Sequence, residues 1–242
     1  SITSSGENVD LYGFSMELNA AECQVKNDGL YFSGTLSLAG VPLLDKSKLT
    51  INELTIGKDA SIKNVSVDIG AEQSISLASW KAALASAALN ENGLKLSGSV
   101  KVKIPESAES GIGFDNLTVS KTTLYGGDFT LPEEGIDVFG IVKMKRGIKP
   151  LSFGRIGNTS VHYIGGSGEF KLPRFIDKTL SVEFFQIQTD GKFEARVPVN
   201  MNIPLLGLAN VSIRSLAFRT IGGVGVDVMG DFNLHAIPFF KA

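Results

Sequence analysis

The stretch that decides the fold is Leu36-Ser37-Leu38-Ala39-Gly40-Val41-Pro42, followed after six residues by Leu49-Thr50-Ile51-Asn52-Glu53-Leu54-Thr55-Ile56. In its second half, the apolar residues stand 7, 9, 12 and 14 positions after the proline. The same offsets recur three times, with Ile112, Phe114, Leu117 and Val119 after Pro105, with Leu180, Val182, Phe185 and Ile187 after Pro173, and with Val211, Ile213, Leu216 and Phe218 after Pro204. Alternation of apolar and polar residues predicts β-strands with one buried face.

The first half of this phrase occurs seven times, about 33 residues apart on average, and closes at Pro42, Gly70, Pro105, Pro132, Pro173, Pro204 and Pro238. Periods of roughly 20–50 residues are typical of stacked units. Because proline has no N–H to donate, we expect these prolines to end strands at corners. The sequence therefore predicts an all-β, elongated repeat of about seven two-strand units, arranged as an antiparallel meander or sandwich or as a solenoid-like stack. The Asp-Gly turns at residues 27–29 and 189–191 favour the meander.

The step of three residues between offsets 9 and 12 breaks the alternation of the strand. Residues 7 and 9 positions after the proline share one face, and an odd step would turn the next two to the other face. Since all four are apolar in four copies, we expect a β-bulge or corner between offsets 9 and 12 that keeps them on one face.

Two parts of the chain depart from the phrase. After Gly70 the second strand is missing from the pattern, and residues 76–89 carry Leu77, Trp80, Leu84 and Ala88 at helical spacing, which predicts one short α-helix. After Pro132 the spacing stretches. We expect a single elongated domain over residues 1–242, with sub-units at 1–92 and 93–242, that is a piece of a larger protein or a subunit in a larger assembly.

Composition excludes several classes of function. A net charge of −2 and a pI of about 5.8 give no overall basic field that would attract nucleic acid or an anionic membrane. Cys23 is the only cysteine, so no intramolecular disulfide can form. No apolar run reaches the roughly 18 residues of a membrane-spanning helix. Many glycine, serine, threonine and asparagine residues indicate a turn-rich β protein at an extracellular or cell-envelope location.

Catalytic groups are sparse in the sequence. His162 and His235 both lie in alternating strand patterns, and solvated strand histidines explain them better than a metal ligand or a general base. Glu133 and Glu134 are adjacent on a turn and would not face each other across a substrate. We therefore predict a non-enzymatic protein without a cofactor or metal, and keep a carbohydrate-active β-solenoid enzyme as an alternative.

One run of cations stands out, formed by Lys143, Lys145, Arg146, Lys149 and Arg155. Val142 and Met144 alternate with the lysines, which predicts a solvated strand face opposite the core. The alternative is a patch that binds an anionic glycan, a phosphate or a lipid head group.

Two classes of function fit the repeat. The first is a structural or adhesive binding module of a cell-surface, fibre or multi-subunit assembly, which associates with protein partners or with itself through sheet edges or ends. The second comes from a resemblance, because the Leu-x-Ile-x-x-Leu-x-Ile units look like the repetitive β-groove proteins of the AsmA and TamB type. That resemblance implies an apolar trough that binds lipid, lined here by Ile51, Leu54, Phe114, Leu117, Phe185 and Phe218.

Overall fold

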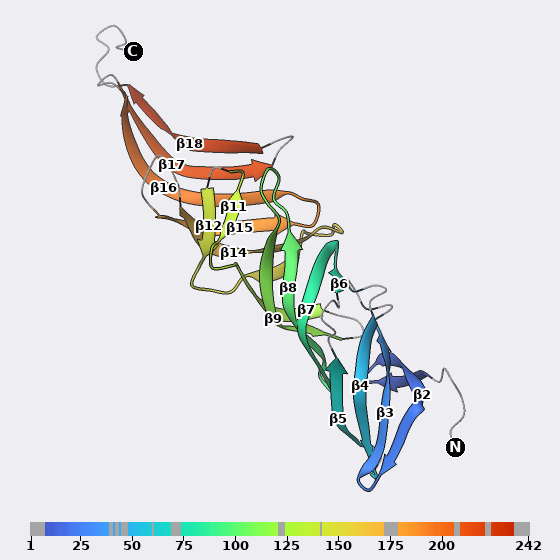
Figure 1. Ribbon diagram of the computed structural model, residues 1–242. Coiled ribbons are helices and arrows are strands. Elements are labelled where there is room, and N and C mark those ends of the chain that lie inside the picture. The colour runs from blue at the N-terminus through green and yellow to red at the C-terminus, as the bar shows by residue number, and fades with distance from the viewer. Residues whose placement is uncertain are drawn as a thin grey trace. The chain divides into compact units, whose positions relative to one another are not determined.

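The computed structural model describes residues 8–38, 41, 44, 48–59, 61–68, 74–120, 124–140, 142–171, 179–205, 209–220 and 224–234. All helices and strands that could be assigned in these ranges are strands, and none is a helix (Figure 1). The all-β prediction is therefore confirmed. Contacts divide the chain into two compact units, Ser1–Lys101 with Gly111–Phe129, and Val102–Ser110 with Thr130–Ala242.

The first unit contains two five-stranded sheets. One has the order β1-β2-β3-β4-β5, with bounds Asn8–Leu11, Phe14–Lys26, Gly29–Ser37, Lys48–Gly57 and Ile62–Asp68. The other has the order β10-β9-β8-β7-β6, where β6 to β10 are Ser74–Leu77, Trp80–Asn90, Gly93–Val102, Ser110–Val119 and Leu124–Thr130. Strands adjacent in each sheet are therefore also consecutive in the chain.

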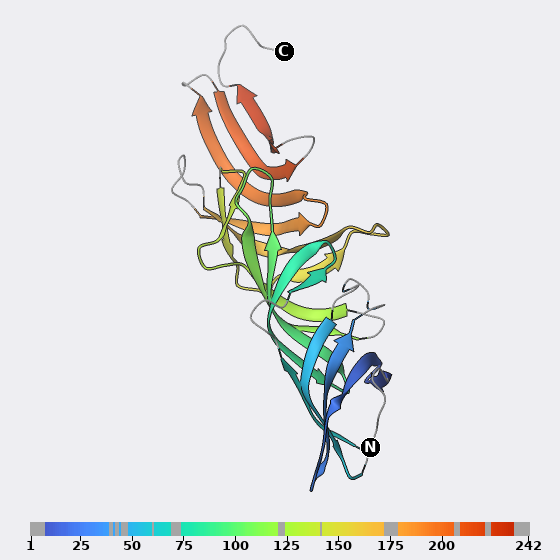
Figure 2. The same cartoon turned by 45° about the vertical axis from the view of Figure 1, so that its right-hand side comes forward.

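The second unit contains an eight-stranded sheet with the order β11-β12-β14-β15-β16-β17-β18, in which β13 also pairs with β14. The bounds of β11 to β14 are Ile136–Val138, Val142–Arg146, Ser152–Arg155 and His162–Lys171. Those of β15 to β18 are Thr179–Gln188, Phe193–Leu205, Ala209–Thr220 and Val224–Leu234. The long strands, orange to red in Figure 2, lie side by side and curve into a half-barrel.

Each strand pair whose register is defined is antiparallel, as the meander prediction requires. The two-residue turn at Asn27-Asp28 joins β2 to β3, with Lys26 opposite Gly29, and a turn at 189–191 joins β15 to β16. Both predicted hairpins are confirmed. The repeat of seven units is not confirmed, because the strands in the described part of the chain form three sheets, of five, five and eight strands.

The predicted bulge between offsets 9 and 12 is confirmed in all four copies. In β4 the register shifts between Ile51 and Glu53, in β15 an extra residue lies between Val182 and Phe185, and in β17 the shift is between Ile213 and Ser215. In β9 it is marked by the left-handed φ of 55° at Asn116. In each strand the described apolar residues on both sides of the bulge are buried or half-buried, so the bulge keeps them on one face.

The predicted helix at residues 76–89 is wrong, because this segment forms the hairpin of β6 and β7, in which Leu77 pairs with Trp80. β7 carries its own bulge between Leu84 and Ser86, so its inward residues are Ala82, Leu84, Ala87 and Leu89, at the spacing of the other bulged strands. Alanine at two of these positions hid the pattern. Helical spacing was also present, and pairing with β6 and β8 outweighs the high helix propensity of alanine.

The Ala78 turn gives a test whose sign separates a hairpin from a helix. Ala78 has a φ of 55°, which costs a residue with a Cβ about 1 kcal/mol and costs glycine almost nothing. We expect Ala78→Gly to raise the free energy of unfolding by about 0.5 kcal/mol, whereas in a helix the same change would lower it by about 1 kcal/mol. Urea denaturation followed by Trp80 fluorescence measures this change in the free energy of unfolding. Ala82→Gly, at a buried β7 position, should destabilise and serves as the control.

The prolines behave as expected only in part. Pro105 and Pro132 follow the ends of β8 and β10, as predicted. Pro204 does not end its strand, because β16 continues through it and pairs it with Asn210. Pro42, Pro173 and Pro238 lie outside the described residues.

Glycine and serine lie opposite the bulges on the neighbouring strand. A Cβ added to Gly98 of β8 would overlap the carbonyl oxygen of Ala83, next to the bulge of β7. On the other side of β8, the hydroxyl oxygen of Ser97 accepts a hydrogen bond from the Asn116 amide at 3.3 Å. Ser33-Gly34 has the same place in β3, since Gly34 pairs with Ile51 beside the bulge of β4. The Ser-Gly pair therefore lets bulged strands approach closely and supplies a partner for a backbone group at the bulge.

Candidate functional site

The residues predicted to line an apolar trough lie in the core. All six are at most 2% exposed, namely Ile51, Leu54, Phe114, Leu117, Phe185 and Phe218. Phe114 packs against Phe129 with ring centres 5.8 Å apart, and Phe218 meets Phe170 edge to face at 5.0 Å. They belong to three different sheets.

The predicted basic run is exposed throughout, and the structure separates its last member from the rest. Lys143 and Lys145 point away from the buried Val142 and Met144, as expected for a solvated strand face. Arg146 and Lys149 continue the exposed cations into the turn after β12. Arg155 pairs with His162, seven residues along β14 from the partner of Lys145, which corresponds to roughly 23 Å.

Two residues next to this run were not predicted. Lys171 pairs with Lys143 across β12 and β14 and is exposed, so it adds a cation to the same face. Ile148 follows Gly147, precedes Lys149, and is 101% exposed, so it has no packing contact that hides it from water. An apolar residue between two cations in a Gly-x-x-Pro turn was the available sequence signal.

A polar hollow of about 310 Å³ lies where the irregular part of β2 and the bulge of β4 flank β3. Lys26 lies over the Tyr31 ring, with Nζ 3.7 Å from the ring centre. The Tyr31 hydroxyl donates a hydrogen bond of 2.6 Å to Asp28, which lowers the pKa of Asp28 and raises that of Tyr31. Glu53, Asn52 and Cys23 also line the hollow, which offers a cation, a carboxylate and an amide to a small polar group.

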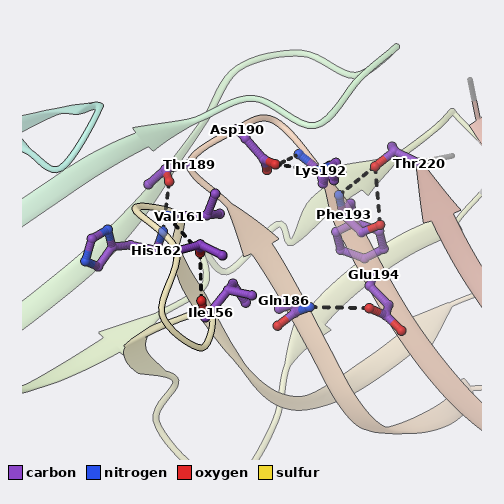
Figure 3. A network of polar contacts seen from close by, with 11 residues as sticks. Ile156, Val161, His162, Gln186, Thr189, Asp190, Lys192, Phe193, Glu194 and Thr220 are labelled. Atoms are coloured by element: carbon purple, nitrogen blue, oxygen red, sulfur yellow. Dashed lines mark hydrogen bonds and ion pairs between the residues drawn. The ribbon is translucent and has the colours of Figure 1, made fainter. Parts of the chain in front are cut away.

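His162 lies at the start of β14 within a set of turn contacts (Figure 3). Its amide donates to the Thr189 hydroxyl oxygen at 2.9 Å, and the Thr189 amide donates to its carbonyl at 2.8 Å. The ring stacks on Phe153, with centres 5.5 Å apart and planes 10° apart. Its Nδ1 is buried without a hydrogen-bond partner. Burial, opposed by a backbone hydrogen bond at Ser160 and assisted by the charge of Arg155, lowers the pKa of His162.

His162 should make stability depend on pH. The pKa of the folded state lies below the unfolded value of 6.5, so the unfolded chain binds the proton more tightly. The contribution is present above about pH 6.5 and is lost as the pH falls through the lower folded pKa. We expect the free energy of unfolding of His162→Phe to fall less than that of the parent as the pH is lowered from 7.5 to 5. The midpoints of urea denaturation at each pH measure this difference. Identical pH dependence in both proteins would contradict the assignment.

The remaining chemistry-bearing residues are dispersed. Glu133 and Glu134 are exposed on the turn closed by the Gly135 amide and the Pro132 carbonyl, 2.9 Å apart. His235 lies outside the described residues. In the described part of the chain, no three His, Cys, Asp or Glu side chains come close enough together to hold a metal ion.

The same described ranges contain no helix that is long and apolar enough to cross a membrane. Comparison with models of protein families, with curated proteins and with solved structures finds no match to this chain.

Proposed function

We propose that this chain is a non-enzymatic structural and binding module that joins a larger assembly through a sheet edge. The observation that carries the proposal is the length of β18, an edge strand of 11 residues whose pairing with β17 extends from Val224 to Leu234. The outer side of such a strand presents alternating N–H and C=O groups that can pair with another strand.

The other edges are shorter or carry features that discourage pairing. β1, β6, β11 and β13 have three or four residues each. β10 contains Gly126 and Gly127, whose φ angles of 67° and 91° break a regular edge, and β5 has seven residues against the 11 of β18. The sequence of β18 contains neither lysine nor proline. β18 is therefore the edge best suited to accept a partner strand.

Burial of the repeated apolar residues supports this function over a lipid groove. A groove needs apolar side chains that face an open trough, and the six expected to line it are at most 2% exposed. Because these side chains pack inside the protein, they are not available to a ligand, and the sheet edges and polar faces are the surfaces that can bind. The simplest partner is a second copy, because two β18 edges related by a twofold axis can pair antiparallel.

Light scattering over a concentration series tests the edge with two proline variants. Adjacent residues of a strand point their N–H groups to opposite sides. One of the two variants Asp227→Pro and Val228→Pro therefore removes a hydrogen bond to β17, and the other removes an N–H group only from the outer side of β18. We expect the parent to associate, and the outer-side variant to keep its circular dichroism and become monomeric. A parent that remains a strict monomer, or an outer-side variant that still associates, would overturn assembly through β18.

Native mass spectrometry distinguishes the lipid alternative. Under the proposed function the purified protein carries no lipid and cannot be loaded with one. A stoichiometric lipid adduct would contradict the structural module and favour the lipid-binding groove.

A further inference from the structure

The turn between β12 and β13 combines an exposed apolar tip with cations. We call residues 145–150, with the sequence Lys-Arg-Gly-Ile-Lys-Pro, the basic loop. Ile148 is the most exposed large apolar side chain among the described residues, at 101%. The backbone at Gly147 lies against Ser167 of β14, so the base of the loop is held to the sheet while its tip faces water.

The cations of the basic loop are available to an external anion. Lys145, Arg146 and Lys149 are exposed, and the side chain of none of them forms an ion pair or hydrogen bond within the described part of the chain. Lys143 and Lys171 add two exposed cations on the adjoining strand face. Between Asp137 and Glu169 the sequence contains five Lys or Arg residues and no carboxylate. The two bounding acids pair with Lys143 and Lys145 in the register and offset part of this charge.

We propose that the basic loop binds the surface of an anionic lipid bilayer, with Ile148 entering the boundary between head groups and acyl chains. This proposal is independent of the function proposed for β18. A chain with a net charge of −2 has no general attraction to anions, so a local patch must supply it. Lysine and arginine beside an inserted side chain can keep their charges at the head groups while their stems lie along the apolar boundary.

Ile148 favours a bilayer over a soluble polyanion such as a nucleic acid or a sulfated glycan. A polyanion would pair with the cations and leave the exposed isoleucine in water, whereas a bilayer removes it from water. Phe184, which is 42% exposed, lies at the bulge of β15, and only β14 separates that strand from β12 and β13. It provides a second apolar residue on the same sheet. Arg196, opposite Phe184 on β16, is also exposed.

Sedimentation with vesicles tests the proposal on the whole chain. We expect binding to vesicles of phosphatidylcholine mixed with phosphatidylserine, weaker binding as salt is raised, and little binding to phosphatidylcholine alone. Equal binding to both kinds of vesicle, or no binding to either, would overturn the proposal.

Two pairs of variants separate charge from insertion. Lys145→Glu with Lys149→Glu should lower partitioning at least about tenfold, since each cation near an anionic surface contributes roughly a factor of five. Lys81→Glu with Lys95→Glu changes the net charge equally at exposed positions of the other unit and should have a much smaller effect. Ile148→Asp should lower partitioning about tenfold or more, and Val25→Asp, at a position 79% exposed, should not.

A tryptophan at the tip reports insertion directly. The native Trp80 is 8% exposed and gives a constant background. Ile148→Trp should shift its emission to the blue with anionic vesicles, and should not do so with soluble heparin, while Val25→Trp should not shift with either. If Ile148→Asp binds vesicles as the parent does and heparin competes fully, the loop is a polyanion site and insertion is wrong.

Discussion

Gly98→Val is expected to lower the free energy of unfolding of the first unit by at least about 3 kcal/mol. Gly98 lies in β8 opposite Leu84, at the point where β7 bulges. A Cβ there would overlap the carbonyl oxygen of Ala83, and this atom belongs to the backbone of the paired strand and cannot rotate away. The strands must separate, which breaks ladder hydrogen bonds on both sides of the bulge. Urea denaturation followed by fluorescence of Trp80, which begins β7, measures this unit.

Gly111→Val is the matched control. Gly111 lies in β9 of the same sheet, its φ is not positive, and an added Cβ would meet nothing within 4 Å. Valine favours strands over glycine, so we expect this variant to be neutral or to gain up to about 1 kcal/mol. If both variants lose the same stability, the loss comes from valine itself and not from the close approach at the bulge.

Phe185→Ala is expected to cost the second unit about 3–5 kcal/mol, the usual range for a phenylalanine deleted from a core. Phe185 is fully buried in β15, pairs with Ala195 and Gly166 on either side, and its ring lies over Gly168. Glycine at that position cannot fill the space that the ring would leave, so a cavity remains. Hydrogen exchange of the amides in β14 to β16 measures the loss where it occurs.

The neighbouring residue supplies the control for this substitution. Phe184 is 42% exposed because the bulge turns it away from the core, and Phe184→Ala should cost less than about 1 kcal/mol. A reversed order of the two effects would mean that the bulge of β15 lies one residue from its assigned place. The pair therefore tests the register as well as the core.

Helix against strand could not be decided from residues 76–89 alone. Leu77, Trp80 and Leu84 fit helical spacing, and Ala82, Leu84, Ala87 and Leu89 fit a bulged strand. Alanine is the best helix former and is depleted in strands, so local preference in this segment favours the helix. Backbone hydrogen bonds to β6 and β8 stabilise the strand, and a short stretch of sequence does not reveal which strands will pair with it.

In the basic loop and the strand before it, the sequence predicts the exposure of some side chains and not of others. Exposure of Lys143 and Lys145 followed from alternation with Val142 and Met144. Exposure of Ile148 did not, because an apolar residue is expected inside unless the backbone carries it away from the sheet. Only the turn between β12 and β13 shows that it faces water beside Lys149.

The sequence by itself determined the all-β class, the two Asp-Gly hairpins and the bulge between offsets 9 and 12. These depend on the period-2 geometry of a strand and on the φ preferences of a few residues, which are local properties. The tertiary structure alone decided that the strands form three sheets, that β6 and β7 replace a helix, and that β18 is a long edge. Those outcomes depend on which strands pair across distant parts of the chain, and pairing energy comes from backbone groups that every residue shares.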